Sequence, residues 1–230
     1  MKEEFLKNIP KIKKYTVINN PYDIEKIQKL SEEKIQDFNF SQNKKYIISV
    51  GRLSTEKRFI TLIEILKKLN ENIELILLGE GDEKQQLEDF TQKNDLSKRV
   101  HILGKKKNPF KYIKKSNIFV LASEGEGFPN VLVEAMICET PVISTDCISG
   151  PREILAPNTD INFQLKSNIE LAHNGILYPV DNKKSLKLAI ETMLNDTEMQ
   201  EKYIKNGLEK SQEYALKKII EKYKEILCVA

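Results

Sequence analysis

Short apolar segments alternate with longer amphipathic ones through most of this sequence. The short segments are rich in Val and Ile and apolar on both faces: YIISVG (46–51), IELILLG (73–79), VHILG (100–104), NIFVLAS (117–123) and PVISTD (141–146). Because they are too short for helices, they are typical of strands buried in a parallel sheet. Apolar residues recur at helical spacing between them, at 59–69, 83–94, 109–116 and 129–138. The alternation predicts an α/β fold with a doubly wound parallel sheet and right-handed crossovers.

The two ends of the sequence predict additions to this sheet. Residues 1–44 contain one helical segment, at 23–35, and are interpreted as a lead-in and not as a domain of their own. A later strand, GILYPV at 175–180, is followed by charged helical segments from 183 to about 227, with a break expected near 195–199. We therefore expect residues 45–230 to form one Rossmann-like domain with a helical tail.

Charge and cysteine content exclude several classes of protein. The 37 Lys and Arg residues are interspersed with 34 Asp and Glu residues, whereas a nucleic-acid-binding protein would show a basic stripe. Three irregularly spaced cysteines and two histidines argue against a disulfide framework or a zinc site and favour a reducing cytoplasm. No stretch approaches the roughly 18 apolar residues of a membrane span. The lysine-rich stretch at 104–115 has two interpretations, a solvated helix face or a surface that meets an anionic ligand or a membrane.

Candidate binding residues follow the first two strands, because ligands of such sheets bind outside the carboxyl ends of the strands. After the first strand, GRLSTEK places Arg52 and Lys57 beside a helix start. Cations beside free helix amides suit a phosphate or diphosphate, and two solvated surface charges are the alternative. After the second strand, GEGDEK is acidic and should repel a phosphate, so it is interpreted as a turn with Asp82 as helix N-cap.

The stretch EGEGFPNVLVEAM, at 124–136, predicts an anion site at a helix start. Pro129 suits the first helical position, which leaves three amides pointing out of the helix, those of Asn130, Val131 and Leu132. Gly125 and Gly127 allow a tight turn and close approach of a ligand to the backbone.

Glu134 follows about five residues into the same helix, and its side chain leans back toward the helix start. A carboxylate there accepts hydrogen bonds from a vicinal diol, so a sugar or ribose beside a phosphate is the expected ligand. In the alternative, Glu126 only stabilises the helix start and Glu134 is solvated. The apolar residues around Glu134 oppose that alternative, because an unpartnered carboxylate is costly among them.

The ordered set of motifs resembles the C-terminal domain of retaining GT-B glycosyltransferases of family GT4. The motifs are SVGRLSTEK, EGFPNVLVE, PVISTDCISGPREIL and NGILYPVDN, and the resemblance runs from INNPYDIEKI at 18–27 to the C-terminal helices. It implies a domain that binds a nucleotide-sugar donor of the UDP or GDP type and needs no cofactor. The sequence has no DxD motif, which fits the metal-independent chemistry of that family.

The resemblance also implies a role for each candidate residue. Arg52 and Lys57 would contact the donor diphosphate, Glu134 would hold the ribose hydroxyls, and Glu126 would lie beside the transferred sugar. Arg52, Lys57 and Glu126 are the expected catalytic group, because stabilising the departing diphosphate is the protein's main task. The loop from Gly104 would border the base, and the remaining expected binding residues are Gly51, Lys105, Gly127, Phe128, Asn130, Val131 and Leu132.

One residue and one domain depart from the family pattern. Members often carry Lys-Gly where this sequence has Lys57-Arg58. A GT-B enzyme also has an N-terminal Rossmann-like domain that binds the acceptor, and residues 1–44 resemble the interdomain segment that follows it. We therefore expect this chain to bind donor but to transfer little alone. The implied enzyme is a hexosyltransferase of polysaccharide or glycoconjugate synthesis, cytoplasmic or peripheral to the inner face of the membrane, with a glycan or lipid-linked acceptor.

Three other classes of protein are alternatives to a glycosyltransferase domain. A dinucleotide-dependent oxidoreductase would place G-x-G-x-x-G after the first strand, where GRLSTEK stands instead. A nucleotide-sugar epimerase with a GT-B fold would have a similar site. A non-catalytic nucleotide-sugar-binding fragment is the third alternative.

Overall fold

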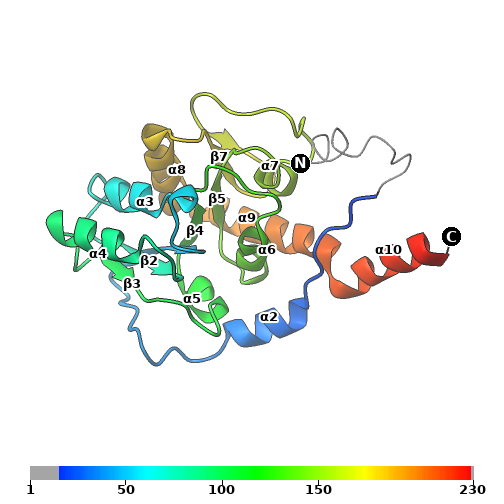
Figure 1. Ribbon diagram of the computed structural model, residues 1–230, viewed down its shortest axis with the longest axis horizontal. Helices are drawn as coiled ribbons and strands as arrows, with labels where there is room; N and C mark the ends of the chain where they lie inside the picture. The colour runs from blue at the N-terminus through cyan, green and yellow to red at the C-terminus, as the bar shows by residue number, and fades with distance from the viewer. Residues whose placement is uncertain (1–15, 229–230) are drawn as a thin grey trace.

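The computed structural model describes residues 16–228, so the first 15 residues of the predicted lead-in lie outside the described residues. One seven-stranded sheet forms the centre of the described chain, in the order β3-β2-β1-β4-β5-β7-β6 (Figure 1). Its parallel strands are β1 (Lys45–Val50), β2 (Ile73–Leu78), β3 (Val100–Ile102), β4 (Ile118–Leu121), β5 (Val142–Thr145) and β7 (Ile176–Tyr178). The predicted doubly wound sheet is confirmed, and its strand order reverses between β1 and β4, where such folds bind ligands.

The helices pack on both faces of the sheet because strand residues alternate between the two faces. Ile47 of β1 joins one apolar cluster with Ile63 and Ile190, whereas Ile48 joins the other with Val133. The four predicted helical segments form α3 (Phe59–Leu66), α4 (Lys84–Lys93), α5 (Phe110–Lys115) and α6 (Asn130–Ile137). The lead-in helix is α2 (Ile24–Ser31), which ends four residues before the predicted end at 35.

One α-helix and one strand of the described chain were not predicted. The short helix α7 (Pro151–Leu155) follows β5, and β6 (Glu170–Leu171) pairs antiparallel with β7. They are linked by Arg152, whose buried guanidinium bonds both carboxylate oxygens of Asp146 at 2.9 and 2.7 Å and reaches Glu170 at 2.8 Å. This network fixes the chain after β5.

The helical tail consists of α8 (Lys183–Asn195), α9 (Thr197–Ser211) and α10 (Leu216–Cys228), with the 3-10 helix η2 (Gln212–Tyr214) before α10. The predicted break lies at Asp196, whose side chain accepts a hydrogen bond from the amide of Met199. At the second break, which was not predicted, Tyr22 of the lead-in donates its amide to Tyr214 and accepts from that of Leu216. The lead-in and the joint between α9 and α10 therefore lie side by side.

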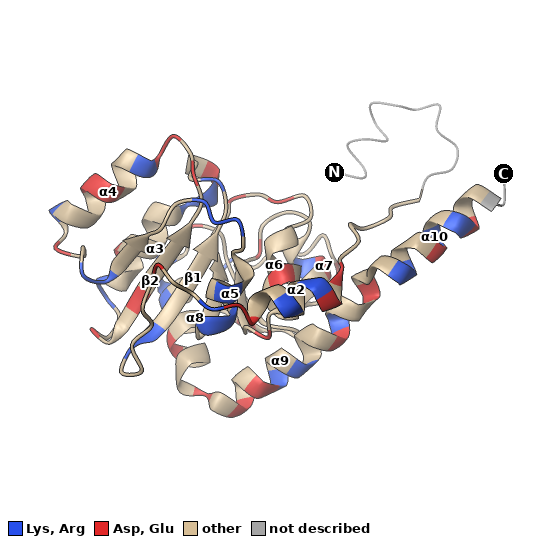
Figure 2. Cartoon of the chain, turned by 90° about the horizontal axis from the view of Figure 1, so that it is seen from below, with Lys and Arg blue, Asp and Glu red and all other residues tan. Residues whose placement is uncertain are grey.

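Helix α10 extends away from the sheet (Figures 1 and 2). Ile219 is buried, but four other apolar residues of α10 are 41–71 % exposed: Ile220, Tyr223, Ile226 and Leu227. Acidic and basic residues are mixed along α9 and α10 (Figure 2). Within residues 16–228, no helix combines the length and the apolar character needed to cross a bilayer.

Two predicted helix starts were wrong by one residue. The N-cap of α4 is Glu83, not Asp82, and it makes no side-chain capping bond. Pro129 is the N-cap of α6, not its first helical residue. The ring therefore precedes the helix, and the Pro129 carbonyl is free to accept a hydrogen bond from the helix start.

Candidate functional site

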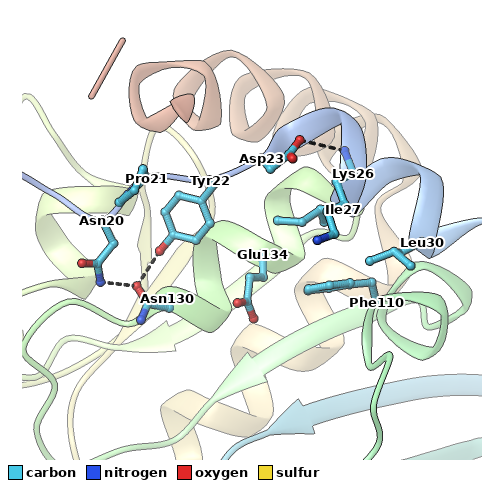
Figure 3. Close-up of a pocket in the computed structure, with 10 residues that line it drawn as sticks. All are labelled: Asn20, Pro21, Tyr22, Asp23, Lys26, Ile27, Leu30, Phe110, Asn130 and Glu134. Atoms are coloured by element: carbon cyan, nitrogen blue, oxygen red, sulfur yellow. Dashed lines mark hydrogen bonds between the residues drawn. The ribbon is translucent and has the colours of Figure 1, made fainter. Parts of the chain in front are cut away.

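Two cavities lie near the carboxyl ends of the central strands. The larger, of about 520 Å³, lies between the lead-in and α6 and is lined by Asn20, Pro21, Tyr22, Asp23, Lys26, Ile27, Leu30, Phe110, Asn130 and Glu134 (Figure 3). The smaller, of about 390 Å³, is lined by Val50, Gly51, Arg52, Leu78, Gly79, Glu80, Lys105, Lys106 and Pro109. Two consecutive residues line the two cavities, Pro109 the smaller and Phe110 the larger.

Glu134 directs its carboxylate into the larger cavity (Figure 3). The helix α6 around it is buried, with Val133, Ala135 and Met136 in the core. Burial raises the pKa of Glu134 above its usual value. In the described part of the chain, the carboxylate has no hydrogen-bond partner. It is therefore a partly buried acceptor at the cavity that a ligand hydroxyl would satisfy.

Asn130 lies one turn before Glu134 and lines the same cavity. Its side-chain oxygen accepts hydrogen bonds from the Asn20 amide at 2.8 Å and from the Tyr22 hydroxyl at 2.5 Å. The pKa of Tyr22 is raised mainly by burial and next by the negative charge of Glu134. The hydroxyl therefore stays protonated and donates the hydrogen bond to Asn130. Asn20 and Tyr22 were not predicted as site residues, because the INNPYD stretch carries no charge or glycine pattern before Asp23.

The start of α6 offers fewer free amides than predicted. The Leu132 amide donates to the carbonyl of Pro129 at 3.0 Å, so the prediction of a free amide there was wrong. Among residues 16–228, the amides of Asn130 and Val131 have no such partner. The side chain of Leu132 is fully buried, and that of Val131 packs against the same core.

The turn before α6 is held by packing on both sides. A Cβ on Gly150 would come within 2.9 Å of the Gly127 carbonyl oxygen. The ring of Phe128 packs edge-on against Tyr214, with ring centres 5.3 Å apart. The structure therefore places Gly127 and Phe128 in a fixed turn that leads into the cavity wall.

Lys57 and Glu126 are paired with each other. The Lys57 ammonium lies 2.6 Å from Glu126 Oε1, and the Ser123 hydroxyl donates to the same oxygen at 2.7 Å. Both side chains are mostly buried, and neither is among the residues that line the two cavities. Two of the three predicted catalytic residues are thus in contact, whereas Arg52 lies in the smaller cavity.

The smaller cavity brings together Gly51, Arg52 and Lys105 from two loops. Gly104, which precedes Lys105, has a φ of 70° and accepts a hydrogen bond from the amide of Gly79 at 3.1 Å. The loop is thereby fixed to the end of β2, with Lys105 and Lys106 at the cavity.

Two of the six lysines in the stretch at 104–115, Lys106 and Lys114, form ion pairs with described residues. Lys106 pairs with Asp37 at 2.6 Å, and Lys114 pairs with Glu32 and Glu139. The Lys106 ammonium and the Tyr112 hydroxyl together lower the pKa of Asp37 to about 2. These contacts fasten the lead-in to α5 and to the loop before it.

Comparison with known proteins places the chain in a family. The family model described as glycosyl transferases group 1 matches residues 31–210. An uncharacterized glycosyltransferase of Methanocaldococcus jannaschii is 34% identical over 234 residues, which cover 93% of this chain and 57% of the relative. The N-acetylgalactosamine-N,N'-diacetylbacillosaminyl-diphospho-undecaprenol 4-alpha-N-acetylgalactosaminyltransferase of Campylobacter jejuni is 35% identical over 191 residues, 83% of this chain and 47% of the relative. The chain thus spans about half the length of these curated relatives.

Solved structures share the fold. A crystal structure of Anabaena HepE in complex with UDP superposes with a TM-score of 0.75 at 23% identity, over 94% of this chain and 57% of that one. The sucrose-phosphate synthase of Thermosynechococcus elongatus superposes with a TM-score of 0.76 at 22% identity, over 100% of this chain and 57% of that one. Both are matched over the seven-stranded sheet and its helices, the fold of the GT-B glycosyltransferases. The chain belongs to the glycosyl transferases group 1 family.

Proposed function

We propose that this chain is the donor-binding domain of a retaining, GT4-type hexosyltransferase and that its ligand is a nucleoside-diphosphate sugar. One observation carries the proposal: the partnerless Glu134 carboxylate faces a cavity beside the start of α6. A partly buried carboxylate suits a vicinal diol, and a helix start suits a phosphate. A ribose diphosphate presents both groups at adjacent positions.

The nucleotide spans the two cavities in this proposal. The base lies in the smaller cavity, between Val50, Leu78 and Pro109 and beside Lys105. The ribose hydroxyls bind Glu134, and the diphosphate lies between Arg52 and the free amides at the start of α6. The Pro109–Phe110 step is where one ligand passes from one cavity to the other.

Transfer depends on stabilising the departing diphosphate. Its negative charge grows as the bond to the sugar breaks, and cations that are already in place stabilise it without reorganising. Arg52 supplies one cation, and Lys57, held 2.6 Å from Glu126, supplies the other. In retaining transfer the departing diphosphate accepts the acceptor proton on the same face of the sugar, while Glu126 lies beside that sugar.

The comparisons support a UDP-sugar and a lipid-linked acceptor. The HepE structure contains UDP, and the Campylobacter jejuni relative is named for N-acetylgalactosaminyl transfer to a diphospho-undecaprenol-linked sugar. We accordingly assign the protein to cell-surface polysaccharide or glycoconjugate synthesis, in the cytoplasm or peripheral to the inner face of the membrane.

A second domain binds the acceptor in this proposal. The chain spans about half of its curated relatives, 57% and 47% of their lengths. Helix α10 exposes Ile220, Tyr223, Ile226 and Leu227 on the part that extends from the sheet. This apolar surface is the expected contact with that domain, and residues 1–44 are the expected interdomain lead-in.

Calorimetric titration with a panel of UDP-sugars, GDP-sugars, UDP and uridine tests the proposal. We expect UDP-sugars and UDP to bind more tightly than uridine, because only they reach Arg52 and the start of α6. Binding of none of these ligands would refute the proposed function.

A further inference from the structure

Arg58 adopts a backbone conformation that favours glycine. It separates the 3-10 helix η1 (Thr55–Lys57) from α3, with φ 54° and ψ 33°. Residues other than glycine are strained in this left-handed region, because Cβ lies close to the backbone. An arginine here costs stability that a glycine would not.

The Arg58 side chain adds a second cost and gains little stability in return. Its Nε is buried and has no hydrogen-bond partner in the described part of the chain. Its Nη2 forms ion pairs with Glu124, in the loop after β4, and with Asp181 Oδ1 at 2.7 Å, in the loop after β7. All three side chains are 30–62 % exposed, and ion pairs at such positions stabilise a fold weakly. Stability alone therefore does not account for an arginine at this position.

Arg58 and Glu124 lie in the two segments that hold the candidate catalytic pair, the one between β1 and α3 and the loop after β4. Lys57 precedes Arg58 in the chain, and Glu126 follows Glu124 by two residues. The Glu124 amide also donates to the Glu56 carbonyl at 2.9 Å, so the loops lie against each other. The two cations, Lys57 and Arg58, face three carboxylates, those of Glu124, Glu126 and Asp181. The net charge of these five groups is −1, and the loss of Arg58 would change it to −2.

We propose that Arg58 is a positioning residue for the donor diphosphate. By pairing with Glu124 and Asp181 and offsetting one of their two negative charges, it leaves Lys57 with one carboxylate partner, Glu126, and keeps the edge of the site open to an anion. Without Arg58, Glu124 would compete for the Lys57 ammonium and would repel the diphosphate. This inference rests on the proposed function, because it requires an anionic ligand beside Lys57.

Arg58→Gly separates this role from a structural one. Glycine fits the backbone, so the melting temperature should stay the same or rise, while the affinity for UDP should fall roughly fivefold. Uridine, which lacks the diphosphate, should bind as before. Arg58→Gln removes the charge but keeps a long polar side chain and the strained backbone. Its affinity for UDP should therefore fall by the same factor as that of Arg58→Gly. Arg58→Lys should retain most of it.

Asp95→Gly is the matched control for backbone strain. Asp95 is exposed and has a φ of 56°, and it lies at the far end of α4 from the loops of the site. Its replacement by glycine should raise the melting temperature without changing the affinity for UDP. Arg58→Gly/Glu124→Gln should regain affinity, because the carboxylate with which Arg58 paired is then absent.

The titrations distinguish this inference from the proposed function. If the unchanged protein binds UDP and both Arg58→Gly and Arg58→Gln bind it equally well, the role of Arg58 is refuted and the donor site stands. An equal loss for UDP and uridine would also refute it, because damage to the fold and not charge would be the cause. If the unchanged protein binds neither ligand, the proposed function itself fails.

Discussion

Glu134 combines a cost to folding with the role in ligand binding that we propose for it. Burial raises its pKa, so its protonated form is favoured in the folded chain relative to the unfolded one. The sign follows from linkage: the contribution of Glu134 to the stability of the fold is most favourable below the ordinary pKa of 4.5 and falls as the pH rises through the raised value. Glu134→Gln should therefore raise the melting temperature at pH 7, and the gain should vanish below pH 4.5. Thermal unfolding across this pH range tests it, and a lower melting temperature at pH 7 would contradict the account.

Glu134→Gln should also weaken the binding of UDP. A neutral amide accepts hydrogen bonds from the ribose hydroxyls less strongly than a carboxylate, a loss of about 1–3 kcal/mol. The dissociation constant for UDP should then rise roughly tenfold or more. Unchanged affinity in calorimetry would remove Glu134 from the site.

Arg52 and Lys57 should act on the diphosphate and not on the nucleoside. Replacing both residues by alanine should weaken the binding of UDP far more than the binding of uridine. The difference between the two losses should shrink at high salt, because salt screens charge. Lys93→Ala/Lys98→Ala removes the same charge at two exposed positions remote from both cavities and serves as the control. Equal losses for UDP and uridine would show that the variant damages the fold.

Two of the candidate residues that the structure places at a cavity were singled out because their chemistry is costly in their local setting. Glu134 among apolar neighbours and Arg52 after a buried strand needed no tertiary information, and both line a cavity. Asn20 and Tyr22 were missed, because their role depends on contact with Asn130 across more than 100 positions. The free amide expected at Leu132 failed because a proline N-cap still offers its carbonyl to the helix.

The turn between β4 and α6 depends on one glycine in the loop after β5. Gly150 has a φ of 52°, and a Cβ there would lie 2.4 Å from Pro129 Cδ. Gly150→Ala should therefore destabilise the fold by roughly 1–3 kcal/mol through crowding and backbone strain. Gly150→Ala should also weaken the binding of UDP, because the start of α6 must shift. Gly125→Ala is the control, since nothing lies within 4 Å of its Cβ. Urea unfolding compares the two variants, and equal stability would contradict the packing argument.

Strands with an apolar run were located to within two residues, and the shortest elements were not found. Buried parallel strands carry their own signal, because both faces must be apolar. The two residues of β6 carry none, since Glu170 and Leu171 are defined by pairing with β7 and by the Arg152 ion pair. The second break in the tail was missed for a similar reason, because η2 is held by contacts with Tyr22 from the far end of the chain.

The whole molecule is expected to bind donor without efficient transfer. Holding an acceptor against the donor sugar accounts for several kcal/mol of a transfer barrier, on the order of 7–11 in favourable cases. We assign that task to a second domain. This chain alone should show slow or undetectable transfer, and activity should recover when the preceding domain is supplied on the same polypeptide or in trans. Transfer at enzyme-like rates by this chain alone, measured with a labelled UDP-sugar, would contradict the division of roles.

A crystal structure of this chain with UDP tests the central claim most directly. The account predicts uracil in the cavity of Val50, Leu78 and Pro109, both ribose hydroxyls on the Glu134 carboxylate, and the diphosphate beside Arg52 and the start of α6. UDP bound in any other place, or bound with Glu134 turned away from the ribose, would contradict it.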